Sequence, residues 1–300
     1  MMRSMFTASS GLKAHQMLLD VTANNLANVN TIGYKASRAS FQDSLTQVQG
    51  VGAASSPGFG GSNTKQVGLG VTVGAIANQM GAGSFQVTGS SLDVAIQGDG
   101  WIRVGNGTPT SGNPTAGAPT GAAVNFTRSG NFTTNDKGYL ITTDGYYVMG
   151  KVATDTAGTG GVADCYIEIP KGATDIAIAP DGAVSFIPPA GYTQPAALPP
   201  IGADGRAIGG YMSVSTFQNT PGLQRITNNR WMATAQSGTE QAGTPGGQYG
   251  QSIAGVLEMS NVDMASEFTT MISAQRGFQA NSRVISTTDQ MLQDLVNLIR

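Results

Sequence analysis

Apolar residues recur at every seventh position at both ends of the chain. In the N-terminal segment they are Met5, Leu12, Leu19 and Leu26, with Ala8, His15, Thr22 and Val29 at the intervening position. The C-terminal segment has a stronger row, made of Met264, Met271, Phe278, Ile285, Leu292 and Ile299, with Phe268, Gln275, Ser282, Asp289 and Val296 between. A sevenfold apolar repeat is the pattern of helices that pair in a coiled coil. We therefore expect helices within residues 1–34 and 258–300 that pair with each other.

End signals agree with these two helices. Ser260, followed three residues later by Asp263, resembles a capping box before an apolar run. Gly33 stands where a left-handed cap would end the N-terminal helix. Several apolar residues lie off the sevenfold rows and are free to face a second neighbour, as subunits of a tube would require. They are Val21, Ile272, Val284, Met291 and Leu295.

The middle of the chain has a different texture. Short β-prone runs, such as LDVAIQGDGWIRVGNG from Leu92 and DIAIAPDGAVSFI from Asp175, alternate with glycine turns. Asp-Gly pairs at 99/100, 144/145 and 181/182 are hairpin signals. We predict a β-rich outer domain over residues 71–236, with extended connectors at 35–70 and 237–257 and long loops near 105–123 and 188–200. The fold class is mixed and mainly β: a β-rich central domain flanked by the two helices of an inner assembly domain.

Four asparagines, Asn24, Asn25, Asn28 and Asn30, lie in the predicted N-terminal helix, within DVTANNLANVN at residues 20–30. Asparagine is a poor helix former because its amide competes for backbone hydrogen bonds. We predict that Asn24, Asn25 and Asn28 hydrogen-bond to neighbouring helices and fix their register. The alternative is a frayed helix end with solvated amides.

Composition supports a chain that packs against copies of itself. Charged residues are 11% of the sequence, against about 25% in an average globular domain. The net charge of −2 gives no long-range attraction for nucleic acid or an anionic membrane. No apolar run reaches the roughly 18 residues of a spanning helix, so we expect no membrane insertion. The N-terminus lacks the apolar core of a cleavable signal peptide, so export would need another route.

Candidate chemistry is sparse. One histidine, His15, and one cysteine, Cys165, cannot supply a metal site or a catalytic triad. The glycines of GLGVTVG lack phosphate-loop spacing. We predict no catalytic, cofactor-binding or metal site. A hidden carboxylate pair leaves one rival, a secreted β-domain enzyme acting on glycans; its candidates are Asp93, Asp99, Asp136, Asp144, Asp164, Glu168, Asp175 and Asp181.

Both ends of the chain resemble one known family. The run LDVTANNLANVNTIGYKASRASFQD, from Leu19, resembles the N-terminal signature of the bacterial flagellar rod and hook family. The tail from SNVDMASEFTTMISAQRGFQ to DQMLQDLVNLIR resembles its C-terminal signature. QVGLGVTVGAI, SSLDVAIQGDGWIRV and FTRSGNFTTNDKGYLITTDGYYVMG resemble β-domain segments of the same family. The resemblance spans nearly the whole chain.

The resemblance implies a tubular homopolymer outside the cytoplasmic membrane, with terminal helices in its inner wall and β domains outside. It also implies export by the flagellar type III apparatus without signal cleavage, and contacts with other axial proteins: rod, hook cap and hook-filament junction. VGLGVTVGAIANQM, LVNLIR and NTPGLQRITNNRWMATAQSG look more like the hook protein, a flexible universal joint that transmits torque from rod to filament. The length of residues 36–70 is more like the distal rod protein of the basal body, a stiffer tube. We expect a short hook protein, with the distal rod subunit as the alternative.

The expected assembly interface combines the two apolar rows with the asparagines. Its residues are Met5, Leu12, Leu19, Asn24, Asn25, Leu26, Asn28, Met264, Phe268, Met271, Phe278, Ile285, Leu292, Val296 and Ile299.

Overall fold

The chain forms two compact units that alternate along the sequence. The computed structural model describes residues 2–54, 60–107, 124–153, 162–190, 192, 198, 201–202 and 205–298. Unit 1 comprises Met1–Val29, Ala36–Gln79 and Val262–Arg300, and unit 2 comprises Asn30–Lys35 and Met80–Asn261. The chain therefore passes between the units at 29/30, 35/36, 79/80 and 261/262.

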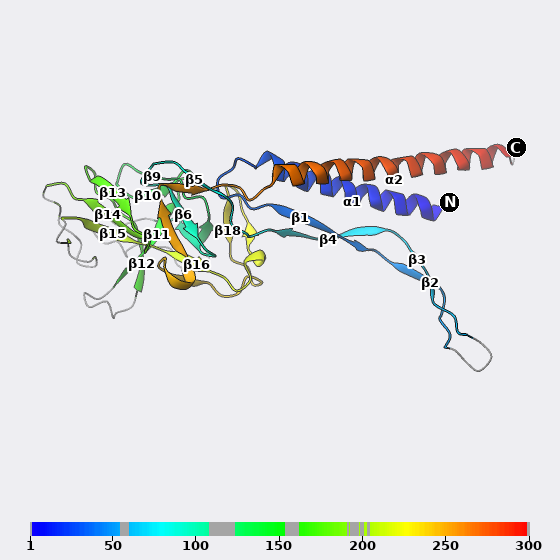
Figure 1. Cartoon of the computed structure of the whole chain (residues 1–300), viewed down its shortest axis with the longest axis horizontal. Helices are drawn as coiled ribbons and strands as arrows, with labels where there is room; N and C mark the ends of the chain where they lie inside the picture. Colours follow the sequence, from blue (N-terminus) through cyan, green and yellow to red (C-terminus); the bar gives the residue numbers. More distant parts are fainter. Residues whose placement is uncertain are drawn as a thin grey trace. The chain divides into compact units, whose positions relative to one another are not determined.

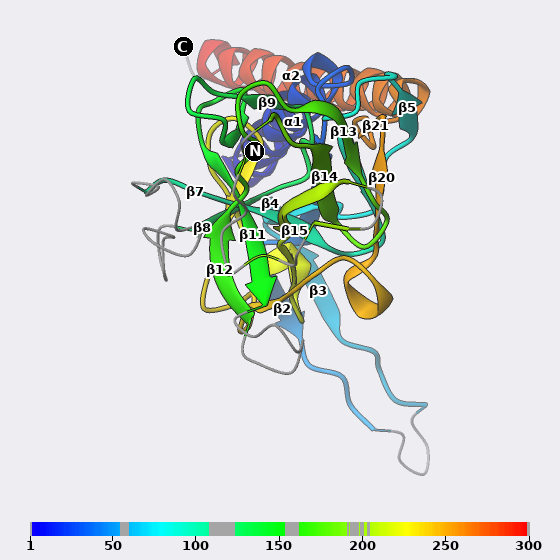
Figure 2. The same ribbon diagram turned by 90° about the vertical axis from the view of Figure 1, so that its left-hand side faces the viewer.

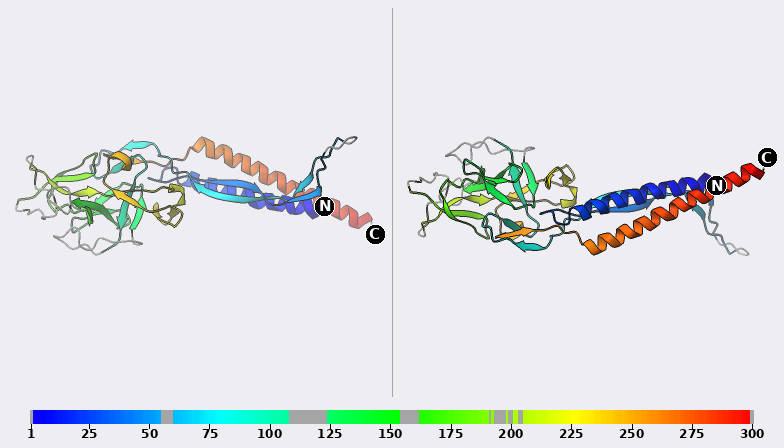
Figure 3. Two further views of the ribbon diagram at one scale, coloured as in Figure 1. Left: turned by 90° about the horizontal axis from the view of Figure 1, so that it is seen from below. Right: turned by 90° about the horizontal axis from the view of Figure 1, so that it is seen from above.

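Unit 1 consists of two long helices and a long β-hairpin. Helices α1 (Met2–Ala27) and α2 (Met264–Leu298) lie side by side, and the hairpin runs along α1 (Figures 1 and 3). Strand β1 (Ser37–Asp43) pairs antiparallel with β4 (Val71–Asn78), and beyond them β2 (Thr46–Gly50) pairs with β3 (Lys65–Gly68). The hairpin is fastened to α1 where the backbone N–H of Val71 donates a 3.3 Å hydrogen bond to Oγ of Ser10.

The helix ends differ from the predicted ones. Helix α1 ends at Ala27, and Gly33 lies outside it in a left-handed conformation with φ of 67°, its N–H bonded to the carbonyl of Glu258. Asp263, and not Ser260, caps α2: its Oδ1 accepts a 2.9 Å hydrogen bond from the N–H of Ala265. An aspartate at this position satisfies an N–H that the helix leaves free.

Unit 2 is built around a 13-stranded antiparallel sheet, counted over the described residues. Its main path runs β13-β14-β15-β11-β7-β8-β18-β17. Figure 2 shows β7, β8, β11 and β12 along one side of unit 2, with β13, β14 and β20 along the other. The strands are β7 (Trp101–Gly105), β8 (Val124–Thr127), β9 (Phe132–Thr134), β10 (Leu140–Thr142), β11 (Tyr147–Ala153), β12 (Val162–Tyr166), β13 (Thr174–Ile178), β14 (Ala183–Ile187), β15 (Ala207–Met212), β16 (Val214–Thr216), β17 (Gln224–Arg225), β18 (Arg230–Met232) and β19 (Gln241–Gly243).

Two small ribbons complete unit 2. Strand β6 (Val94–Gln97) pairs with β20 (Gln251–Ala254), and β5 (Phe85–Val87) pairs with β21 (Val256–Glu258). The aliphatic core gathers side chains from β6, β7, β11, β14 and β15. A second, aromatic core centres on Trp101 and Trp231, whose rings meet edge to face at 5.6 Å.

The structure confirms the predicted fold class, a β-rich body with a helix at each end, but it moves the internal boundaries. Residues 35–70 are not a simple connector, since β1 and β2 form the outgoing arm of the hairpin in unit 1 and β3 begins its return arm. Residues 71–78, expected in the β domain, are the hairpin's return strand β4. Residues 237–257, also expected to be a connector, contain β19, β20 and part of β21. Backbone pairing needs no large side chains, so Gly- and Ser-rich segments can still form strands.

Two of the three predicted Asp-Gly turns join paired strands. Gly145 and Gly182 have φ of 81°, between β10 and β11 and between β13 and β14. Gly100 follows β6, which pairs with β20 and not with β7. Most of the two expected loops, residues 108–123 and parts of 191–200, lies outside the described residues.

Candidate assembly interface

The two helices pack through a seam of small and polar residues. Ala8, Thr22 and Asn25 are each at most 4% exposed on α1, and Gly11 is buried with them. On α2 the buried residues are Ala274 and Thr288. Small residues let two helix backbones approach closely, so this seam is tight without being rich in apolar area.

Two glycines fix the register of the helix pair. A Cβ at Gly11 would lie 2.6 Å from Nδ2 of Asn281, and a Cβ at Gly277 would lie 2.5 Å from Cε1 of His15. Gly11 lies opposite Asn281, and His15, four residues later on α1, lies opposite Gly277, four residues earlier on α2. The helices are therefore antiparallel, and each glycine is a notch for a larger side chain of the partner helix.

The heptad rule predicted the spacing of this seam but not its position. On α2 the contact is made by Gly277 and Asn281. Neither residue belongs to the predicted row, which passes through Phe278 and Ile285. Phe278 remains 37% exposed. Periodicity shows how apolar residues are spaced, but it cannot show which of two adjacent rows the partner covers. The alternate N-terminal row, which includes Ala8, His15 and Thr22, is the one that faces inward.

The predicted interface residues therefore divide into three groups. Met264, Phe268, Phe278 and Val296 are exposed. Met5, Leu12, Leu19, Leu26, Met271, Ile285 and Leu292 are half-buried. Ile299 lies outside the described residues.

The three asparagines have different roles. The Asn25 side chain is 1% exposed and holds three segments together. Its Nδ2 donates to the Ser37 carbonyl at 2.8 Å and to Oε1 of Glu267 at 3.2 Å, while its Oδ1 accepts from the N–H of Ser37 at 3.0 Å. These bonds tie α1 to β1 and α2, in the register that the two glycine notches define. Asn28 instead donates to the carbonyl of Asn24 at 2.9 Å, at the end of α1.

His15 is part of this packing. Its ring lies edge to face with Phe41 of β1 at 5.9 Å, and its buried Nδ1 has no hydrogen-bond partner in the described part of the chain.

Cys165 is fully buried in the sheet of unit 2, and burial raises the pKa of its thiol to about 12. Within the described ranges, no three His, Cys, Asp or Glu side chains are grouped to hold a metal ion, and no helix is long and apolar enough to cross a membrane.

Large apolar side chains are displayed mainly by unit 1. Of the large exposed hydrophobic residues in the described segments, 18 belong to unit 1 and 4 to unit 2. They lie on both helices and along the hairpin, where β2 and β3 are exposed on both faces. A two-stranded ribbon of this kind is marginally stable alone in water. Contiguous exposed apolar surface is typical of an association site.

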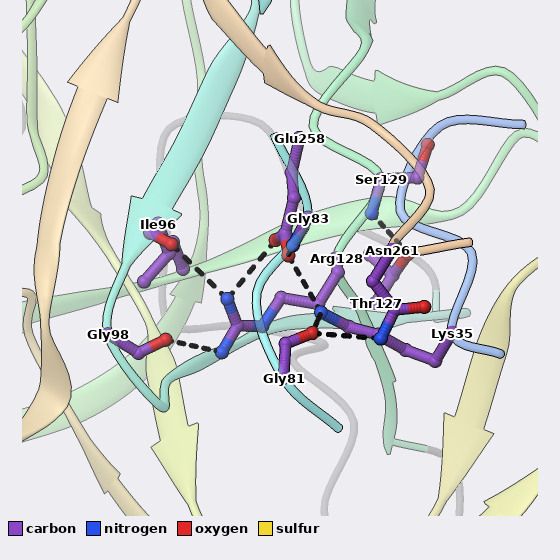
Figure 4. A network of polar contacts seen from close by, with 10 residues as sticks. All are labelled: Lys35, Gly81, Gly83, Ile96, Gly98, Thr127, Arg128, Ser129, Glu258 and Asn261. Atoms are coloured by element: carbon purple, nitrogen blue, oxygen red, sulfur yellow. Dashed lines mark hydrogen bonds and ion pairs between the residues drawn. The ribbon is translucent and has the colours of Figure 1, made fainter. Parts of the chain in front are cut away.

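A buried ionic cluster in unit 2 was missed by sequence reasoning. Glu258 is 0% exposed; its Oε1 accepts from Nζ of Lys35 at 2.7 Å and from the N–H of Gly83 at 3.0 Å. Its Oε2 accepts from Arg128 at 3.1 Å (Figure 4). Lys35 also donates to the carbonyl of Gly81 at 2.9 Å. Burial lowers the pKa of Lys35, an effect that Glu258 opposes and Arg128 reinforces.

This cluster is structural. Both carboxylate oxygens of Glu258 accept hydrogen bonds from donors of the chain. The Arg128 guanidinium also donates to the carbonyls of Ile96 and Gly98 and lies 5.2 Å from the Trp101 ring centroid. The one sequence signal was the rarity of charged residues, which makes a Lys or Glu within a β-prone stretch unusual.

Fold and surface together define a class of protein: a structural subunit that displays its large apolar side chains on a helical and hairpin unit. Comparison with known proteins gives the family. Residues 5–35 match the family model "Flagella basal body rod protein", 95–186 match "Flagellar hook protein FlgE/F/G D1 domain", and 253–298 match "Flagellar basal body rod FlgEFG protein C-terminal".

Individual relatives agree with these models. The chain is 40% identical to the flagellar basal-body rod protein FlgG of Bacillus subtilis over 302 residues, covering all of both chains. It is 37% identical to FlgG of Caulobacter vibrioides, covering 97% of each. It is also 41% identical to the flagellar hook protein FlgE of Helicobacter mustelae, over 52% of this chain and 32% of that protein. The chain belongs to the flagellar rod and hook protein family, whose members are structural axial proteins and not enzymes.

Proposed function

We propose that this protein is the distal rod subunit of the flagellar basal body and that it assembles into a tubular homopolymer. The observation that supports the rod over the hook is likeness along the whole chain. Rod proteins match it from end to end, whereas the hook protein matches about half of it. The hook subunit, our first expectation, is the second candidate.

The assembly role is proposed for unit 1. Its helices and hairpin carry most of the exposed apolar side chains, which in an isolated chain are an unfavourable surface and in a polymer would be buried. In this proposal the helices belong to the inner wall and unit 2 lies outside it. Export by the flagellar type III apparatus and contacts with adjacent axial proteins are part of the same proposal.

Gold-labelled antibodies against this protein, applied to isolated hook-basal bodies, test rod against hook. We expect label on the rod and none on the hook; label along the hook would support the second candidate. Self-assembly is tested separately with purified protein in rising sulfate, which strengthens apolar association. Sedimentation and electron microscopy should then detect tubes. A variant truncated by both terminal helices should form none.

A further inference from the structure

The helix seam continues beyond the end of α1. Nine residues separate Gly11 from Met2, where α1 begins, and nine residues beyond Asn281 is Gln290. Residues 291–298 of α2, here called the α2 overhang, therefore have no α1 residue opposite them. Figure 1 shows this end of α2 extending past the N-terminus.

The seam becomes more apolar where α1 stops. In the paired region it is occupied by Gly277, Asn281, Val284 and Thr288. In the overhang the same spacing of three and four residues continues with Met291, Leu295 and Leu298. These three side chains are 51%, 43% and 86% exposed. An exposed apolar stripe is unfavourable in water, so burial against a partner would stabilise it.

An apolar groove of matching length lies between α1 and β4. It has a volume of about 520 Å³ and is lined by Ser10, Lys13, Ala14 and Met17 of α1 and by residues 71–76 of β4. Its rim residues Met17 and Ile76 are 42% and 49% exposed. Eight helical residues span the groove on α1 and eight form the overhang, and each stretch is about 12 Å long at 1.5 Å per residue.

Charges on the two surfaces are complementary. The charged residue in the overhang is Asp294, which stands three residues after Met291 and four before Leu298, on the flank of the apolar stripe. The charged residue lining the groove is Lys13.

The overhang cannot enter the groove of its own molecule. In the register of the pair, the α1 side of the groove lies opposite residues 275–282 of α2, nine or more residues before the overhang begins. At 1.5 Å per residue this is a separation of about 13 Å along one rigid helix. The occupant must come from another molecule.

We propose that the α2 overhang of one copy docks in the α1–β4 groove of a second copy, with Asp294 against Lys13. This inference rests on the proposed homopolymer and specifies one of its contacts. Since the donor and the acceptor surfaces differ, the contact is heterologous and can continue from copy to copy.

Engineered cysteines test the contact directly. Met17→Cys and Leu295→Cys are introduced together; the native Cys165 is fully buried and does not compete. In oxidised tubes we expect a ladder of disulfide-linked multimers on a non-reducing gel, and no ladder from either single variant. The control pair is Phe268→Cys with Leu295→Cys, since Phe268 is 48% exposed but lies outside the groove. Tubes without a Met17/Leu295 ladder, or an equal ladder from the control pair, would overturn the contact.

A charge exchange gives a second readout that needs no cysteine. Lys13→Glu and Asp294→Lys should each raise the critical concentration for assembly about fivefold, the scale of one partly exposed ion pair. The double variant should return to within about twofold of the wild type. If the double variant is no better than the single ones, the contact is wrong even though tubes form. If the wild type forms no tubes, the proposed function itself fails.

Discussion

The buried carboxylate of Glu258 is expected to be the most sensitive single position of unit 2. Glu258→Gln keeps the size and shape of the side chain while removing its charge. The perturbation leaves Lys35 and Arg128 facing an amide whose NH2 group is itself a donor. Two cations, 1% and 3% exposed, then share a site without a counter-charge.

The magnitude follows from burial and from the number of bonds lost. Removing one partner of a buried ion pair costs roughly 3–5 kcal/mol. Lys35→Met is the matched control, because it leaves the 3.1 Å Arg128–Glu258 pair and the Gly83 bond intact. The Gly81 carbonyl still accepts from Asn261 at 3.1 Å. Since Arg128 still neutralises the Glu258 carboxylate in this variant, Lys35→Met should cost clearly less than Glu258→Gln.

Tryptophan fluorescence isolates the unit concerned. The sequence has two tryptophans, Trp101 and Trp231, and both are buried in the aromatic core of unit 2. Both α-helices of the described residues lie in unit 1, so circular dichroism at the α-helix band reports mainly unit 1 in the same samples. With a urea dependence of about 2 kcal/mol per molar, the Glu258→Gln fluorescence midpoint should fall by roughly 1.5–2.5 M.

Two results would refute this reasoning. One is a Glu258→Gln midpoint within about 0.5 M of the wild type, which would mean that solvent or relaxation compensates the stranded cations. The other is a Lys35→Met variant as unstable as Glu258→Gln. The cluster would then need the positive charge of Lys35 as well as that of Arg128.

Three further predictions concern unit 1 and are measured by urea unfolding followed at the helix band. Asn25→Ala should destabilise the helix pair by about 2 kcal/mol because it strands buried polar groups, while the exposed neighbour Asn24→Ala should be nearly neutral. Gly277→Ala should be destabilising alone, since its methyl meets His15, but stabilising by about 1 kcal/mol in a His15→Ala background through helix propensity. If Gly277→Ala is destabilising in both backgrounds, Gly277 is not needed to make room for the His15 ring. Burial raises the pKa of Glu267, so the folded state binds this proton more tightly than the unfolded state. Stability should therefore fall as pH rises from 4.5 toward neutrality, and this slope should weaken in Glu267→Gln.

Local patterns predicted the elements of this chain better than their partners. The period of the terminal helices was visible because heptad spacing depends only on neighbouring residues. The seam was not, because His15 and Gly277 meet through packing that no local pattern records. The rows rich in Met, Leu and Phe were assigned to the helix pair, yet Met264 and Phe268 remain half exposed.

The ionic cluster and the hairpin were hidden for a related reason. Lys35 and Glu258 are 223 residues apart in the chain, so no spacing rule connects them. Residues 49–70 are rich in Gly, Ser and Pro and looked like part of a connector, because strand pairing by backbone groups leaves little trace in composition. That the asparagines fix register between neighbouring helices stays a prediction; within the chain, Asn25 bonds to Ser37 and Glu267, which are distant in sequence.

The Glu258 cluster lies beside three of the four places where the chain crosses between unit 1 and unit 2. Lys35 is the last residue before one crossing, Gly81 is the second residue after another, and Asn261 precedes the last. Lys35 donates to the Glu258 carboxylate and to the Gly81 carbonyl, which also accepts from Asn261, so a force applied at any of these crossings reaches the same polar cluster. Because these three crossings share one polar cluster, loss of the Glu258 charge should weaken all three together.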